Sequence, residues 1–129
     1  MGVKIDTREK FHVITIKQPA FAANMTADLQ NCLLSLPKSS VKNVVLNLGD
    51  VKTMDESAAE TLVRIQQDFY DQNMSFVICC LQPELEEWLD RIGLLEIMNT
   101  TPTESEAWDV VQMEEIERDI LDGDDKGGL

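Results

Sequence analysis

The chain has one histidine, three cysteines and few basic residues. Enzyme sites and metal sites both need several titratable groups that converge, and His12 is the only histidine available. An odd number of cysteines without metal-ligand spacing does not predict a disulfide framework. The 129 residues carry 24 acids against 11 bases, whereas nucleic-acid binding depends on clustered bases. We therefore expect no enzyme, no nucleic-acid partner, no metal and no cofactor.

Long apolar runs are also missing. The longest covers residues 76–81 and is far shorter than the roughly 20 residues that a membrane-spanning helix needs. The first twenty residues are charged, so no signal-peptide apolar region fits there. These absences predict a cytoplasmic protein with no direct membrane insertion. A net charge of −13 maintains solubility or favours basic protein surfaces as partners.

Strand-like and helix-like segments alternate along the chain. Strands are predicted over residues 3–5, 11–16, 44–48, 76–81 and 95–98, and helices over about 25–36, 55–73, 83–92 and 103–121. Asn24 is a candidate cap for the first of these helices. Strands that alternate with helices predict right-handed crossovers, hence an α/β fold with a mixed, mostly parallel sheet of about five strands and about four helices. We expect one domain over residues 1–121 and a disordered tail, acidic and glycine-containing, over 122–129.

The last predicted helix changes its pattern halfway. Thr103 and Glu106 have capping-box spacing before it, and Ala107, Val110 and Val111 form its first apolar face. Further apolar positions then follow a different register, at Met113, Ile116 and Ile120. Two interpretations stay open: the second half faces something other than the domain's own core, or it is a frayed or solvated helix. The second is favoured by acids near its C-terminal end, where the helix dipole prefers cations.

Residues 43–62 are the most informative segment, because they combine a buried strand, a short polar loop and the start of a helix. Ala58, Leu62, Ile65 and Phe69 follow the three- and four-residue spacing of one buried helical face. Ser57 therefore points away from the core, toward solvent or a partner. It lies in the first turn, where free N–H groups and the helix dipole tolerate an anion such as phosphate.

The start of this helix carries two competing signals. Thr53 followed by Glu56 has capping-box spacing, while Asp55 is able to cap the helix directly. Asp50, Asp55 and Glu56 also offer oxygen ligands for a divalent cation, but their spacing does not match an EF-hand loop. We therefore expect Asp55 to serve mainly as a local cap and loop organiser, and we expect no metal to bind there.

Within this segment, Leu46-Asn47-Leu48, the spaced Asp50 and Met54-Asp55-Glu56-Ser57 resemble the signature of STAS domains, which include bacterial anti-sigma factor antagonists and a module of sulfate transporters. The resemblance extends to Gly93-Leu94-Leu95 and covers most of residues 3–113. In the antagonists the motif reads Asp-Ser-Ser-Gly, and a partner kinase phosphorylates its second serine, which matches Ser57. Here Glu56 replaces the first serine and Ala58 the glycine.

The resemblance implies a non-enzymatic regulatory module that binds an anti-sigma factor with serine kinase activity and is released by phosphorylation, which a phosphatase reverses. The binding residues that it implies are Asp50, Lys52, Thr53, Asp55, Glu56, Ser57, Glu60, Thr61 and Arg64. An alternative, made more credible by Glu56 and Ala58, is a STAS subunit that binds the ATPase of an ABC lipid-transport system. With no coiled-coil heptads, we expect a monomer or weak dimer.

Overall fold

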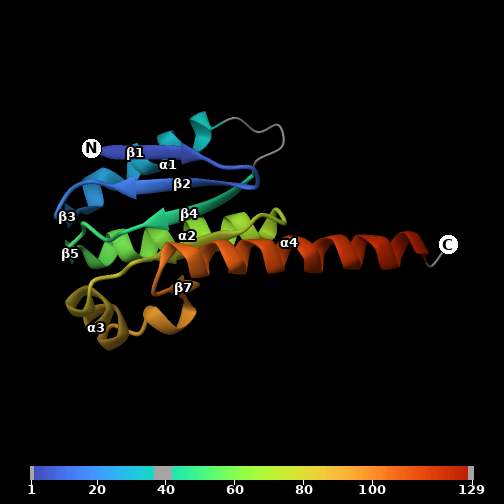
Figure 1. Cartoon of the computed structure of the whole chain (residues 1–129). Helices are drawn as coiled ribbons and strands as arrows, with labels where there is room; N and C mark the ends of the chain where they lie inside the picture. Colours follow the sequence, from blue (N-terminus) through green and yellow to red (C-terminus); the bar gives the residue numbers. More distant parts are fainter. Residues whose placement is uncertain (1, 37–41, 128–129) are drawn as a thin grey trace.

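The computed structural model of the chain describes residues 2–36 and 42–127, with side chains as far as Ile120. Its main sheet has the strand order β1-β2-β4-β6-β7 (Figure 1). The strands are β1 (Val3–Thr7), β2 (Phe11–Ile16), β4 (Asn43–Asn47), β6 (Phe76–Cys79) and β7 (Thr100–Thr101). Only the β1–β2 pair is antiparallel. The predicted α/β class and the mixed, mostly parallel sheet are confirmed.

Four α-helices connect or follow the strands in the described part of the chain. They are α1 (Thr26–Ser35), α2 (Glu56–Asp71), α3 (Pro83–Arg91) and α4 (Glu104–Gly127). A 3-10 turn, η1 (Ala23–Met25), precedes α1, so Asn24 lies inside this turn and the cap predicted there is wrong. Helix α4 continues past residue 121, where the sequence predicted its end. The prediction that residues 122–129 form a disordered tail stays a prediction.

The strand predicted over residues 95–98 is wrong. Leu95–Ile97 forms a second 3-10 turn, η2, and the last strand comes later, at β7. The turn is closed by N–H groups of Ile97 and Met98 that donate to carbonyls three residues earlier. Leu94 and Leu95 still pack against the core and Met98 is buried. A short apolar run is compatible with burial as a strand or as a turn, so its periodicity did not distinguish the two conformations.

Each face of the sheet carries its own apolar core. Ile14 and Ile16 of β2 face α1, α2 and α3, whereas Phe11 and Val13 face α4. The strand alternation that the sequence predicted produces this division, because successive side chains point to opposite faces. Cys79 is part of the core against α4, and burial, followed by the neighbouring Cys80 thiol, raises its pKa. Cys79 is thus packed in the core, as expected for a small apolar residue.

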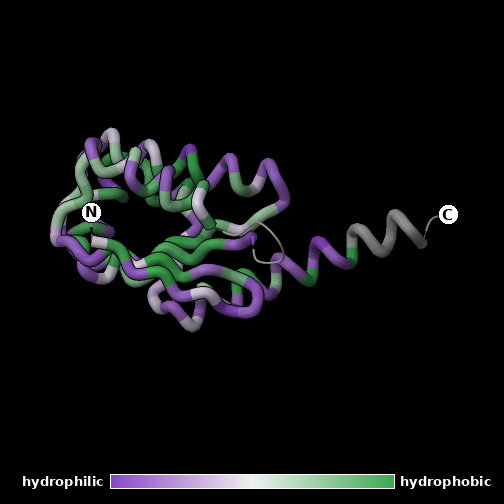
Figure 2. The backbone as a smooth tube through the Cα atoms, turned by 90° about the horizontal axis from the view of Figure 1, so that it is seen from above, coloured by the Kyte–Doolittle hydropathy of each residue, from purple (hydrophilic) through white to green (hydrophobic). Residues whose placement is uncertain are grey.

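Helix α4 is attached to the domain first by apolar and then by polar contacts. Ala107 and Val111 are fully buried against the sheet. One turn later, Tyr70 Oη donates to Glu114 Oε1 at 2.8 Å, and Asn43 Nδ2 donates to Glu115 Oε1 at 2.6 Å. Arg118 Nη2 donates to Ser75 Oγ at 3.1 Å. These contacts fix which side of α4 faces the domain, and Figure 2 shows the helix continuing beyond the sheet.

The Tyr70–Glu114 contact makes a pH prediction. Partial burial, together with Glu114, raises the pKa of Tyr70 from 10.0 to about 12. Because the folded-state pKa is the higher one, stability is complete below about pH 10 and falls as the pH rises toward 12. Tyr70 is the only tyrosine, so phenolate absorbance reports it alone. We expect the folded protein to titrate well above pH 10 and Glu114→Gln to lower the midpoint. Equal midpoints in both proteins would contradict the contact.

Candidate functional site

Ser57 lies in the first turn of α2, and the rotation of this helix is fixed by its apolar side. Ala58, Leu62 and Ile65 are buried, and Phe69 is half-buried against the same core. The buried face is the one that the sequence predicted. Ser57 is exposed on the other side, and within the described part of the chain no other side chain hydrogen-bonds to its hydroxyl. The hydroxyl is therefore accessible to a modifying enzyme or to a binding partner.

The loop before α2 is held by a small second sheet. Strands β3 (Ala20–Phe21) and β5 (Thr53–Met54) pair in parallel. The backbone N–H groups of Lys52 and Thr53 both donate to the Pro19 carbonyl, at 2.7 and 3.1 Å, and Asp55 N donates to the Phe21 carbonyl at 3.2 Å. The backbone that leads to Ser57 is thus tied to a segment that lies far earlier in the sequence.

Asp55 occupies the N-cap position of α2, but its side chain does not cap the helix. Its Oδ2 atom instead accepts a hydrogen bond from the backbone N–H of Ala23 at 2.9 Å. Thr53 lies two residues before the N-cap position, in β5, so both predicted capping arrangements are wrong. The role of loop organiser fits the observed contact, because Asp55 joins the start of α2 to η1. The first N–H groups of an α-helix have no partner within the helix, and the Asp55 side chain does not supply one to α2.

The turn after β4 is fixed from two sides. Asn47 Oδ1 accepts from Gly49 N at 2.8 Å, and Gln82 Nε2 donates to the Gly49 carbonyl at 2.8 Å. A Cβ atom at position 49 would lie 3.1 Å from Asn47 Oδ1, so this close approach favours glycine. Asp50 follows this turn and is exposed.

The nine residues predicted to bind a partner come from the loop after β4, from β5 and from the first turns of α2. All are exposed except Thr61, which is half-buried. Thr61 Oγ1 donates to the Ser57 carbonyl at 2.9 Å, and Arg64 Nη2 contacts Thr61 Oγ1 at 3.4 Å. Four acids and two bases lie among the nine, so the surface has a net negative charge that suits a basic partner.

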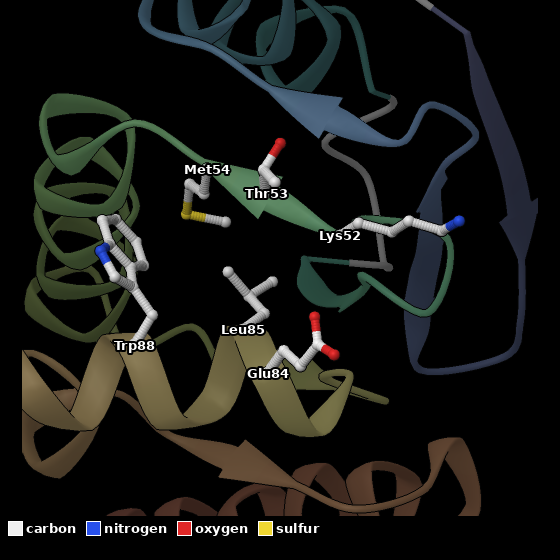
Figure 3. Close-up of a pocket in the computed structure, with 6 residues that line it drawn as sticks. All are labelled: Lys52, Thr53, Met54, Glu84, Leu85 and Trp88. Atoms are coloured by element: carbon white, nitrogen blue, oxygen red, sulfur yellow. The ribbon is translucent and has the colours of Figure 1, made fainter.

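A pocket of about 300 Å³ lies beside this surface, between β5 and α3 (Figure 3). Lys52 and Thr53 belong to the predicted site, whereas the other lining residues, Met54, Glu84, Leu85 and Trp88, were not predicted. The side chains of Met54, Leu85 and Trp88 point into the space between the two elements. The sequence predicts α3 but places residues 53–54 in a loop rather than a strand, and helical periodicity does not indicate which neighbouring segment a helix packs against.

The positions of the single histidine and of the possible metal-ligating side chains bear on the chemistry open to Ser57. Ser57 has no histidine beside it, because His12 is buried in β2 with its Nδ1 atom 2.9 Å from Thr7 Oγ1. Across residues 2–36 and 42–127, no cluster of three or more histidine, cysteine or acidic side chains could hold a metal ion. None of the helices described for this chain combines the length and apolarity required to cross a membrane.

The chain matches the STAS domain family over residues 3–107. It therefore belongs to the STAS domain family, and the match includes the loop, Ser57 and the start of α4.

Solved structures of other proteins share this fold. An anti-sigma factor antagonist from Mycobacterium paratuberculosis is 14% identical, with a TM-score of 0.69, 86% of this chain covered and 93% of that chain. The unphosphorylated form of the anti-sigma factor antagonist SpoIIAA is 16% identical, with a TM-score of 0.62 and coverages of 86% and 96%. A sulfate transporter family protein from Wolinella succinogenes is 16% identical, with a TM-score of 0.67 and coverages of 81% and 86%. At these identities the likeness establishes the fold.

Proposed function

We propose that the protein is a cytoplasmic, non-enzymatic anti-sigma factor antagonist that is switched by phosphorylation of Ser57. Its unphosphorylated form binds an anti-sigma factor that is also a serine kinase, and a phosphatase restores this form. The observation that carries the proposal is the exposed position of Ser57 in the first turn of a helix whose preceding loop is tied in place. Membership of the STAS family and the antagonist folds that resemble this one support it.

The expected effect of phosphorylation is on binding rather than on the fold. A phosphate adds about −1.5 to −2 charges, and its attraction to the helix N-terminus is worth about 0.3 to 1 kcal/mol. The exposed carboxylates of Asp55, Glu56 and Glu60 oppose this gain. The attraction to the helix N-terminus and the repulsion by the carboxylates are of similar size. We therefore expect phosphorylation to leave the fold unchanged. Inside an interface, however, the phosphate would be desolvated at a cost of several kcal/mol, enough to release the partner.

The pocket beside the loop supports the assignment of this surface to protein binding. The apolar side chains of Met54, Leu85 and Trp88 line a space that suits one apolar anchor residue of a partner. Two charged residues, Lys52 and Glu84, also line the pocket. Buried anchors surrounded by polar groups are the usual arrangement in a protein interface.

A second candidate function uses the same surface without obligatory phosphorylation. Glu56 is exposed and already places a negative charge directly beside Ser57, and Ala58 is fully buried where the antagonist motif has glycine. A partner that binds this surface must therefore accept a carboxylate there. In this alternative the protein is a STAS subunit that binds the ATPase of an ABC lipid-transport system.

Intact mass measurement after incubation with ATP and the purified anti-sigma kinase of the same organism tests the proposed function. We expect wild type to gain one phosphoryl group and Ser57→Ala to gain none. Ser105→Ala is a matched control, because Ser105 also follows a glutamate at the start of an exposed helix turn, and it should be modified normally. An unchanged mass, combined with binding to the ABC ATPase, would replace the antagonist by the second candidate.

A further inference from the structure

Helix α4 carries a row of exposed apolar side chains beyond its contacts with the sheet. Met113, Ile116 and Ile120 are 60%, 57% and 56% exposed, and they account for half of the large hydrophobic side chains exposed in the described residues. Their spacing of three and four residues places them on one line along the helix. We call these three residues the α4 stripe.

The direction of the α4 stripe is set by the opposite side of the helix. Ala107 and Val111 are buried against the sheet, and Glu114, Glu115 and Arg118 continue that side with hydrogen bonds to the domain. The usual amphipathic arrangement is therefore inverted after Val111, since polar groups face the domain and apolar groups face water. A solvated extension of the helix gains nothing from this inversion, because exposed apolar area is unfavourable in water.

The charge of α4 argues against a second copy of the chain as the occupant of the stripe. The helix contains ten of the chain's 24 acids and two of its 11 bases, so it supplies eight of the 13 net negative charges. Glu106, Asp109 and Glu117 are exposed on this helix. Three side chains also expose far less than the roughly 800 Å² that each partner buries in a stable dimer. Two such helices brought together would repel each other with little apolar gain.

We infer that the α4 stripe is a docking surface for a basic amphipathic helix of a partner protein. Apolar residues on one face of that helix would cover Met113, Ile116 and Ile120, and its lysines or arginines would lie beside the acids of α4. This surface is distinct from the nine residues predicted to bind a partner around Ser57, which we call the Ser57 surface. Tyr70, near the C-terminal end of α2, contacts Glu114, and Ser57 lies at the other end of α2, about 20 Å away at 1.5 Å per residue.

Three synthetic helical peptides test the inference against the full chain by fluorescence anisotropy in about 0.15 M salt. The first has a leucine stripe flanked by lysine and arginine, the second has glutamate in place of these bases, and the third has serine in place of the leucines. We expect binding of the first peptide and at least tenfold weaker binding of the other two.

Variants of the protein separate the stripe from general charge attraction. The combined Met113→Gln, Ile116→Gln and Ile120→Gln variant keeps every charge and uses a good helix former, and it should bind the basic peptide at least tenfold more weakly. The control combines Ile5→Gln, Leu34→Gln and Ile97→Gln, which are exposed apolar residues elsewhere, and should bind like wild type. The Ser57→Asp variant should also bind the basic peptide like wild type. The experiment therefore tests the α4 stripe independently of the Ser57 surface.

Two results would overturn the inference. Equal affinity of the basic peptide for wild type and the stripe variant would mean that charge alone attracts it. A wild-type dimer in sedimentation that the stripe variant abolishes would assign the stripe to a second copy of the chain.

Discussion

Replacing Leu62 by alanine is expected to lower the free energy of unfolding by about 2 to 5 kcal/mol. Leu62 is 0% exposed in the middle of α2 and belongs to the larger core, together with Ile14 and Leu46 of the sheet. Truncation removes buried methyl groups and leaves a cavity that the surrounding strands fill only in part. Urea denaturation followed by circular dichroism measures the change.

Glu60→Ala is the matched control on the same helix. Glu60 is exposed two residues before Leu62, so its removal should change the free energy of unfolding by no more than about 0.5 kcal/mol. The buried and exposed sides of α2 determine where Ser57 points. Small and equal effects of the two substitutions would therefore invalidate the assignment of the Ser57 surface as well as that of the core.

The sequence predicts those parts of the fold that depend on local periodicity. The alternation of buried strands with amphipathic helices indicated the parallel α/β sheet, and the spacing from Ala58 to Phe69 indicated which side of α2 is buried. The same spacing placed Ser57 on the exposed side. Thr103 was also predicted correctly as a cap, since its Oγ1 accepts a hydrogen bond from Glu106 N at 3.2 Å. Each of these features is decided by residues that are close together in the chain.

Features that depend on distant contacts were not predictable in this way. Asp55 is a residue type that often caps helices, and it stands at the N-cap position of α2. Its carboxylate nevertheless accepts a hydrogen bond from the backbone N–H of Ala23, 32 residues earlier. The pocket needs α3 to pack beside β5, which no spacing within either segment indicates. The change of pattern in α4 was visible as a shift from Val111 to Met113. The contacts of Glu114, Glu115 and Arg118 with the domain explain why the shifted apolar residues face outward.

Replacing Ser57 by aspartate is expected to weaken the binding of the anti-sigma kinase by at least tenfold, which is about 1.4 kcal/mol or more. The substitution adds a negative charge to an exposed position that already has Asp55, Glu56 and Glu60 around it. In solution this charge is hydrated at little cost. Within an interface it must be desolvated without a new partner, so the free energy of binding becomes less favourable while folding is unchanged.

The most direct test of the account is a calorimetric titration of the purified anti-sigma kinase with wild type, Ser57→Ala, Ser57→Asp and Ser105→Asp. Ser105→Asp adds the same charge in the first turn of α4, at a residue outside the nine predicted to bind a partner, and each variant's melting temperature checks its folding. We predict equal affinities for wild type, Ser57→Ala and Ser105→Asp, and an affinity at least tenfold lower for Ser57→Asp alone. Kinase binding that is as tight with Ser57→Asp as with wild type would contradict the account.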